Sequence, residues 1–146
     1  RAAQVHCSPL RSIGRTPVCD VRYEGAAGLR VGGAEAFADL LRFGRVLAAL
    51  QCVGSMQQAL DQTLAYARVR EQFGKPLSVN QAVQWPLAEL QTEAQMVRLL
   101  VYYAAWHLDR DHHMEVSDKV SMANYRANRL VCEAADRAPA VVRPAL

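Results

Sequence analysis

Arg70 is the residue whose type and position first suggest chemistry. It lies near the expected end of a long helical segment, just before Phe73, Gly74 and Pro76. A guanidinium in that place can reach a pyrophosphate and bind it through two parallel hydrogen bonds. The alternative is an exposed arginine favoured only by the negative end of the helix dipole. The pattern around Arg70 therefore decides between a phosphate ligand and an ordinary surface residue.

The sequence predicts no metal centre. His107, His112 and His113 stand with two aspartates in a polar segment, but a spacing of i, i+5 and i+6 does not place three ligands on one helical face. The cysteines at 7, 19, 52 and 132 form no CxxC pair and have no zinc spacing. We interpret the histidine segment as a solvated loop. Free cysteines favour a reducing, cytoplasmic compartment.

Composition limits the class of protein. The 146 residues suffice for one domain, and 51% of them are hydrophobic, which is enough for a packed core. The net charge of +3 gives no support for a nucleic-acid binder. No apolar run of about 18 residues is present, so we expect no membrane span, and the first residues carry no secretory signal. The chain begins with Arg rather than Met, which is consistent with a start further upstream.

Hydrophobic spacing of three and four residues predicts three helices, over about 35–72, 80–110 and 117–137. Gly74 is expected as the C′ residue of the first helix, the regular part of the second should begin close to Pro86, Ser117 should cap the third, and Pro139 should end it. The expected core stripes are Val46, Ala49, Leu50, Val53, Met56, Leu60, Leu64 and Ala67; Leu87, Leu90, Ala94, Val97, Val101, Ala104 and Leu108; and Val120, Ala123, Ala127, Leu130 and Ala134.

The predicted fold is all-α: an up-down antiparallel bundle that resembles an incomplete four-helix bundle. Residues 34–138 would form the bundle, 1–33 an irregular segment with one short strand at 18–23, and 139–146 an aberrant tail. Three helices leave one groove open, which requires a partner chain or a further helix. Trp85, Tyr102, Tyr103 and Trp106 are expected in the core or at an interface.

The pattern that carries a family resemblance lies at residues 65–77, which read AYARVREQFGKPL and are followed by Asn80 and Gln81. It is similar to the YAxxRxxFGxPL pattern of acyl-CoA dehydrogenases, in which a Gln and an L-A-E/D-L/M step follow. Here that step is LAEL at 87–90, and the resemblance runs from about residue 35 to 138. It implies the C-terminal helical domain of a flavoprotein, with 1–33 as a possible remnant of the middle β domain.

The resemblance also implies a chemistry and a cofactor. Complete members remove the α-proton of an acyl-CoA thioester with a carboxylate base while the β-hydride passes to FAD. They assemble into homodimers or homotetramers through this domain. The expected partners are therefore the acyl-CoA substrate and further copies of the chain, with neither nucleic acid nor membrane involved.

Site residues follow by position from the family pattern. Arg70 matches the arginine that binds the FAD pyrophosphate across a subunit interface, and Gln72 and Phe73 match positions that contact the flavin nucleotide. Asn80 and Gln81 match a turn near the adenine; the alternative is that they cap the second helix.

A second set of matches concerns the acyl-CoA side. Arg45 matches an arginine beside the acyl-CoA pocket, with an ordinary solvated helix arginine as the alternative. Asn124 stands where family members commonly have Lys, which weakens any role carried over to it.

The chain departs from the family pattern at the catalytic base. Members continue into a QxxGG turn, whereas this sequence ends in PAVVRPAL. Their glutamate base lies in that later part or directly before the arginine matched by Arg45, and here that position is Gly44. We therefore assign no catalytic residue and expect no dehydrogenase activity from the chain alone.

Two functions remain open at this stage. The first is a truncated acyl-CoA dehydrogenase that contributes an FAD-binding half-site. The second is a non-catalytic helical module that oligomerises with itself or with a full-length relative. Flavin colour after purification distinguishes them. A third interpretation is that the sequence is part of a longer enzyme.

Overall fold

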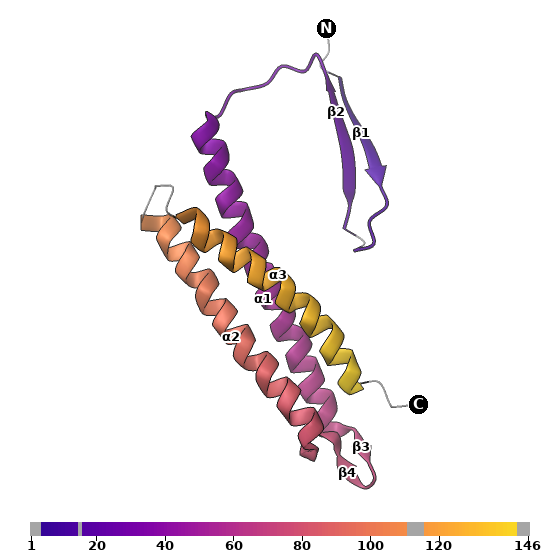
Figure 1. Cartoon of the computed structure of the whole chain (residues 1–146). Helices are drawn as coiled ribbons and strands as arrows, with labels where there is room; N and C mark the ends of the chain where they lie inside the picture. The colour runs from indigo at the N-terminus through magenta and orange to yellow at the C-terminus, as the bar shows by residue number, and fades with distance from the viewer. Residues whose placement is uncertain (1–3, 15, 111–115, 143–146) are drawn as a thin grey trace. The chain divides into compact units, whose positions relative to one another are not determined.

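The computed structural model describes residues 4–14, 16–110 and 116–142 (Figure 1). Asp111, His112 and His113 of the polar segment lie outside the described residues. The chain divides into two compact units, Arg1–Glu35 and Ala36–Leu146.

The first unit contains an antiparallel hairpin of β1 (Gln4–Leu10) and β2 (Val18–Glu24). The register pairs Gln4 with Glu24 and Leu10 with Val18. The strand predicted at 18–23 is therefore present, but its partner was missed. Polar side chains and Pro9 interrupt the alternation in β1, so that strand is recognisable only through its pairing.

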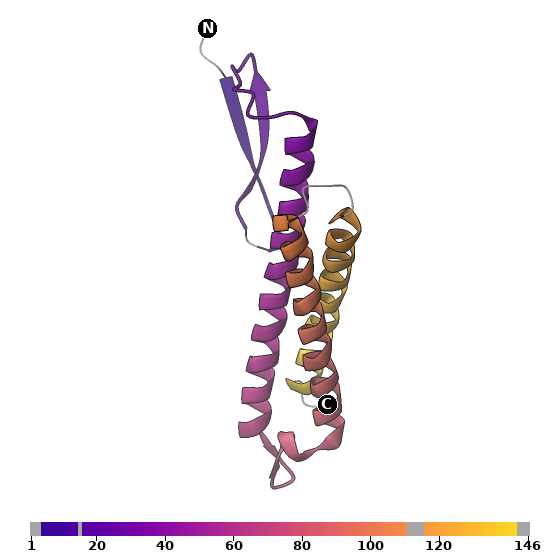
Figure 2. The same ribbon diagram turned by 90° about the vertical axis from the view of Figure 1, so that its left-hand side faces the viewer.

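The second unit is a bundle of three long helices that run side by side, with each helix antiparallel to the one before it (Figures 1 and 2). They are α1 (Ala34–Val69), α2 (Gln81–Arg110) and α3 (Val116–Val142). The all-α bundle fold is thus confirmed. Within the described residues, none of the three helices carries a stretch apolar enough to cross a bilayer.

The core is built from the stripes that the sequence predicts. All the predicted residues of α2 and α3 are buried, together with Val116 and Ala138, and in α1 only Leu50 and Leu64 are partly buried. Thr63 joins the buried side of α1, where its hydroxyl donates to the Ala59 carbonyl at 2.7 Å. Small alanines in both stripes let the backbones of α2 and α3 approach more closely than either approaches α1.

The end of the first helix and the start of the second differ from the prediction. The first helix stops at Val69, three residues early, because the chain turns into a hairpin. The second begins at Gln81 and carries Pro86 inside it, where the missing N–H leaves the Ala82 carbonyl without its helical partner. The prediction that the regular helix begins near Pro86 is wrong, because an N-cap at Asn80 starts it earlier.

The third helix corrects two predictions. It begins at Val116, so Ser117 lies in the first turn rather than at the cap, and its hydroxyl accepts a hydrogen bond from Arg42 Nε at 3.2 Å. It also continues through Pro139 to Val142. The proline φ angle suits a helix, and buried Ala138 holds the preceding turn against the core. Residues 139–142 are therefore helical, and the rest of the predicted tail lies outside the described residues.

Polar side chains join the helices at their edges. The Arg126 guanidinium of α3 donates to Glu93 of α2 at 2.5 Å. Arg98 of α2 donates to Gln57 Oε1 of α1 at 3.1 Å. These half-exposed contacts fix the relative register of the helices, while the apolar stripes supply most of the stability.

Large apolar side chains remain exposed outside the core. Of the two positions predicted for Trp85, Tyr102, Tyr103 and Trp106, the core is wrong, since each is about half exposed or more, and the interface stays a prediction. They lie on the outer side of α2, away from its buried stripe. The early turns of α1 expose a second group, consisting of Phe37, Leu40, Leu41, Phe43 and Leu47.

Candidate functional site

The predicted cofactor residues lie at a short hairpin between α1 and α2. Strands β3 (Glu71–Gln72) and β4 (Lys75–Pro76) pair antiparallel, and a single 3-10 turn, η1 (Leu77–Val79), leads on to α2. Phe73 and Gly74 are the two residues between the strands, with φ of 53° and 74°. Two successive positive φ angles are typical of the tight turn that suits a two-residue hairpin. Gly74 thus serves the hairpin and is not the C′ residue of α1.

Backbone hydrogen bonds hold this connection firmly. The Arg70 N–H donates to the Tyr66 carbonyl at 2.9 Å, and the Arg70 carbonyl accepts from the Leu77 N–H at 2.8 Å. The Asn80 N–H donates to the Leu77 carbonyl at 3.0 Å, and Gln84 Nε2 donates to the Ser78 carbonyl at 2.7 Å. The hairpin is therefore attached to both helices by its main chain, which leaves its side chains available.

The side chains of the hairpin point outward to solvent. Arg70 and Gln72 are exposed, and the Phe73 side chain is 103% exposed. An exposed aromatic ring and an exposed guanidinium on the same short connection could contact a planar, charged ligand. These residues form one open edge, without walls to enclose a ligand.

Lys75 is a cation near this edge that the sequence reasoning did not single out. It stands directly opposite Gln72 in the hairpin, so the two side chains share one face. Glu71 pairs with Pro76 and lies on the other face. Only the hairpin register reveals this arrangement, because the helix predicted up to residue 72 would have placed Gln72 and Lys75 differently.

Asn80 and Gln81 lie at the start of α2, close in sequence to the hairpin. Asn80 Oδ1 accepts a hydrogen bond from the Ala82 N–H at 3.0 Å, as an N-cap does. The alternative that Asn80 caps the second helix is therefore confirmed, with Oδ1 as the capping atom. The N–H groups of its side-chain amide remain for a ligand. Gln81 is exposed as the first helical residue.

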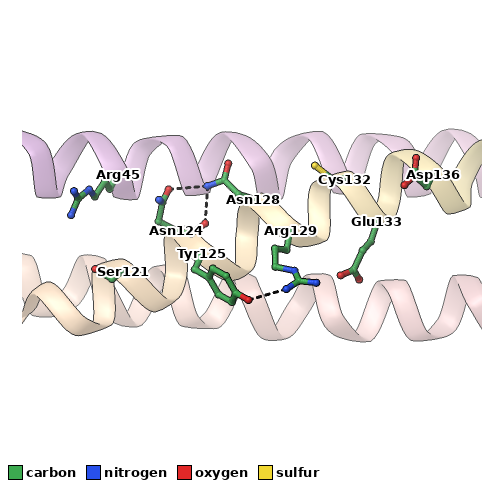
Figure 3. A pocket seen from close by; sticks show the side chains of 9 residues that line it. All are labelled: Arg45, Ser121, Asn124, Tyr125, Asn128, Arg129, Cys132, Glu133 and Asp136. Atoms are coloured by element: carbon green, nitrogen blue, oxygen red, sulfur yellow. Dashed lines mark hydrogen bonds between the residues drawn. The ribbon is translucent and has the colours of Figure 1, made fainter.

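Arg45 lies apart from the other predicted residues. From Arg45 to the end of α1 the helix rises by about 36 Å, so Arg45 and Arg70 cannot hold the same end of a ligand. Arg45 is instead exposed on a groove of about 710 Å³ between α1 and α3 (Figure 3). The α3 residues that line it are Ser121, Asn124, Tyr125, Asn128, Arg129, Cys132, Glu133 and Asp136.

The groove is lined by both basic and acidic side chains, and polar side chains in its middle form hydrogen bonds with one another. Asn128 Nδ2 donates to Asn124 Oδ1 at 3.0 Å, and Arg129 donates to the Tyr125 hydroxyl at 2.9 Å (Figure 3). Asn124, where the family pattern has Lys, thus contributes a neutral amide that is already paired. Arg45 is the α1 residue that lines the groove, and it brings a positive charge to this end of it.

Comparison with known proteins identifies the family. The model of the acyl-CoA dehydrogenase C-terminal domain matches residues 32–142. The chain belongs to the acyl-CoA dehydrogenase family. A probable acyl-CoA dehydrogenase of Bacillus subtilis, YngJ, is 36% identical over 82% of this chain but only 31% of its own length. A 3-(aryl)acrylate reductase of Clostridium sporogenes is 41% identical over 60% of the chain and 22% of its own length.

Solved structures of acyl-CoA dehydrogenase relatives have the same helical architecture. A glutaryl-coenzyme A dehydrogenase in complex with glutaryl-CoA superimposes with a TM-score of 0.81 and 27% identity, covering 95% of this chain and 37% of that one. The ChsE4–ChsE5 complex of Mycobacterium tuberculosis gives 0.79 and 28%, covering 89% and 36%. The present chain therefore spans about a third of the length of these relatives.

Proposed function

We propose that this chain is the FAD-binding and subunit-contacting part of an acyl-CoA dehydrogenase. Arg70, Gln72 and Phe73, with Asn80 and Gln81, would form one wall of the dinucleotide site. The observation that carries the proposal is the hairpin edge, where Phe73 is fully exposed at the turn, Arg70 is exposed where the hairpin begins, and main-chain hydrogen bonds of Arg70 fix the connection. The edge fits one side of FAD, since it offers a charged fork and an aromatic face without enclosing walls.

Each residue has a separate task in this proposal. Arg70 holds the diphosphate, with Lys75 adding positive charge from the neighbouring strand. Phe73 packs its ring on the nucleotide, and Gln72 and Gln81 donate or accept hydrogen bonds at its edges. When bound, FAD would accept the hydride that leaves the β-carbon of the acyl-CoA. The chain itself binds and orients.

Arg45 would serve the acyl-CoA side of the enzyme. Its separation of about 36 Å from the hairpin means that one chain cannot bring both to a single active centre. A homodimer or homotetramer solves this, with the hairpin of one copy serving the centre to which Arg45 of another belongs. The exposed apolar side chains of α1 and α2 support such contacts.

The chain alone should lack dehydrogenase activity. Gly44, next to Arg45, offers no carboxylate to remove the α-proton, and losing a general base costs about 10²- to 10⁴-fold in rate. The test is acyl-CoA-dependent dye reduction by the purified chain with added FAD. We expect no reduction above the buffer rate, and turnover would contradict this part of the proposal.

FAD binding is tested with two arginine variants. The affinity of the chain for FAD is measured by equilibrium dialysis, and Arg70→Ala should weaken it by about tenfold or more, since charge-assisted bonds contribute about 1.5–3 kcal/mol. Arg68→Ala removes the same charge from a neighbouring exposed position and is the matched control. Equal losses for both variants would mean general attraction of an anion, and the site assignment would then be wrong.

A second function is favoured by the outer side of α2. Met96, Leu99, Tyr103 and Trp106 recur at intervals of three and four residues and are all exposed. Such a stripe is typical of a helix that packs on another chain. The alternative is therefore a non-catalytic oligomerisation module. A purified oligomer that carries no flavin and takes up none would favour this alternative.

The cellular compartment belongs to the same proposal. The four cysteines are free thiols, none of them paired in a disulfide. Exposed free thiols persist in a reducing environment, which supports a cytoplasmic location.

A further inference from the structure

A row of exposed side chains runs along α2 on the side away from its buried stripe. Its members, here called the outer row, are Trp85, Thr92, Met96, Leu99, Tyr103 and Trp106. Successive members are three, four or seven residues apart, which is the spacing of a helix face that packs lengthwise on another helix. Large apolar residues exposed at this spacing indicate a protein partner for the face.

Two hollows in the described surface of the bundle lie along the outer row. The first, of about 390 Å³, is lined by Trp85, Ala88, Glu89, Thr92 and Glu93. The second, of about 430 Å³, is lined by Glu93, Met96, Val97 and Leu100 of α2 and by Arg126 of α3. Each set contains four α2 residues at positions i, i+3, i+4 and i+7, which form the hole that receives one side chain of a facing helix in coiled-coil packing.

The outer row is complementary to itself when a second copy of α2 runs antiparallel to the first. If Met96 of one copy lies opposite Leu99 of the other, Thr92 lies opposite Tyr103, because the intervals repeat in both directions. The first hollow then faces Trp106 of the second copy, and the second hollow faces its Leu99. A two-fold axis repeats these contacts, so the pairing closes as a dimer.

The charged side chains at the two ends of the outer row agree with this register. Glu89 lies in the first half of α2 and Arg110 is its last residue, so antiparallel copies bring opposite charges together at both ends. The Glu89 side chain is 64% exposed, and its contact with Arg137 of its own chain is loose, at 3.8 Å. Glu89 is therefore available to the Arg110 of a second copy, whereas Glu93 is held by Arg126.

Trp106 is oriented for this contact before a partner arrives. The guanidinium carbon of Arg110 lies 4.7 Å from the centroid of the Trp106 ring, and the His107 ring meets that ring edge-on with centroids 4.9 Å apart. Trp106 is nevertheless 48% exposed. A tryptophan that is ordered in advance loses little side-chain freedom on association, and tryptophan is among the residue types that most often carry binding energy at interfaces.

The register also agrees with a centre shared between copies. Gln57 of α1 accepts a hydrogen bond from Arg98 of α2, and the two helices are antiparallel, so Arg45 lies level with Arg110 along the bundle. In the antiparallel pair Arg110 lies opposite Trp85 of the second copy, which follows the hairpin by a few residues. The hairpin of one copy is thereby brought to the end of the bundle that carries Arg45 of the other.

We propose that α2 pairs with α2 of a second copy in this antiparallel register, with Trp106 of each copy inserted between Trp85 and Thr92 of the other. The inference rests on the proposed subunit-contacting function and adds its surface and register. One helix pair buries less than the roughly 1,200 Å² of a stable interface, so we expect a dissociation constant of about 10–100 µM. At about 1 µM the chain should be monomeric, and unfolding then reports on the single chain.

The test is sedimentation equilibrium of the full chain without FAD, from about 1 to about 500 µM. Trp106→Ala should raise the dissociation constant by about tenfold or more, because it empties both symmetry-related hollows. Tyr125→Ala is the matched control, since it removes an aromatic side chain of similar exposure from α3, and it should change the dissociation constant by no more than about twofold. Far-UV circular dichroism checks that both variants remain helical.

Exchange of charges tests the register. Glu89→Lys sets two cations side by side across the pair, and Arg110→Glu sets two anions there, so each variant alone should weaken association. The double variant restores opposite charges and should return the dissociation constant to within about threefold of that of the unchanged chain. A parallel pair, or a contact through another surface, would show no such rescue.

Three results would overturn the proposal. The first is a chain that stays monomeric up to about 500 µM. The second is equal weakening of association by Trp106→Ala and Tyr125→Ala. The third is a double charge variant that associates no better than the single variants. Because these measurements contain no FAD, their failure is distinct from a failure of the Arg70 test, which concerns the cofactor edge.

Discussion

Phe73 and Gly74 are adjacent residues that both adopt positive φ, at 53° and 74°. Glycine adopts this conformation freely, whereas a β-carbon makes it cost about 1–2 kcal/mol. The phenylalanine bears that cost while its ring lies wholly in solvent, where it gains nothing from burial. A strained and exposed aromatic residue at a rigid turn points to a contact made outside this chain.

Replacing Phe73 separates stability from binding. Phe73→Asn should keep or raise the free energy of unfolding, by up to about 1 kcal/mol, because asparagine tolerates positive φ. The same variant should weaken FAD binding, since the aromatic face is lost. Thermal unfolding and FAD dialysis on one sample check both results. A variant that is destabilised by more than about 1 kcal/mol would show that the ring packs within the chain.

The buried stripe of α2 should dominate the stability of the bundle. Leu90 is 0% exposed, and Leu90→Ala should lower the free energy of unfolding by about 2–5 kcal/mol through lost burial and a cavity. Leu99 lies on the same helix but is 67% exposed, so Leu99→Ala should change the free energy of unfolding by no more than about 0.5 kcal/mol. Urea unfolding of both variants is the measurement. Similar losses for the two would mean that the outer side of α2 is covered by another chain.

The helical core could be predicted from the sequence because spacing alone fixes it. Leu87 to Leu108 recur every three or four residues, and each of the predicted members is buried. The ends could not be predicted as well, since they depend on contacts distant in the chain. Ser117 looks like a cap, but its hydroxyl accepts from Arg42 of another helix. Pro139 looks like a stop, but the helix continues to Val142.

The thiol of Cys52 should react more slowly than those on the surface. Burial, and then the charge of Cys132, raise the pKa of Cys52, so less reactive thiolate exists near pH 8. Iodoacetamide labelling followed by mass spectrometry should show Cys52 labelled last, with its rate rising at higher pH than for an ordinary thiol. Cys132→Ser should shift that profile to lower pH. An unchanged profile would show that the two sulfurs do not influence each other.

The same shift gives a pH dependence of stability with a definite sign. The Cys52 pKa is higher in the folded chain than in the unfolded chain, so the neutral thiol favours folding. This contribution is complete below the ordinary thiol pKa and is lost as the pH rises through the raised pKa. Cys52→Ala should therefore flatten the decline of stability in the alkaline range.

The residues of the candidate site could be predicted from the sequence, but the hairpin that carries them could not. The pattern at 65–77 singled out Arg70, Gln72 and Phe73, and the structure places all three at one exposed edge. The hairpin escaped prediction because its strands have only two residues each, too few for a period. Lys75 was missed for the same reason, since only the pairing with Gln72 reveals its position.

The most direct test maps FAD on the chain by NMR. Amide shifts of the isotope-labelled chain are followed as FAD is added, a method that also detects weak binding. The largest changes should fall on Arg70, Gln72 and Phe73, extend to Asn80 and Gln81, and disappear in Arg70→Ala but not in Arg68→Ala. Changes confined to the groove near Arg45, or an unaltered pattern in Arg70→Ala, would contradict the assignment of the hairpin edge to the dinucleotide.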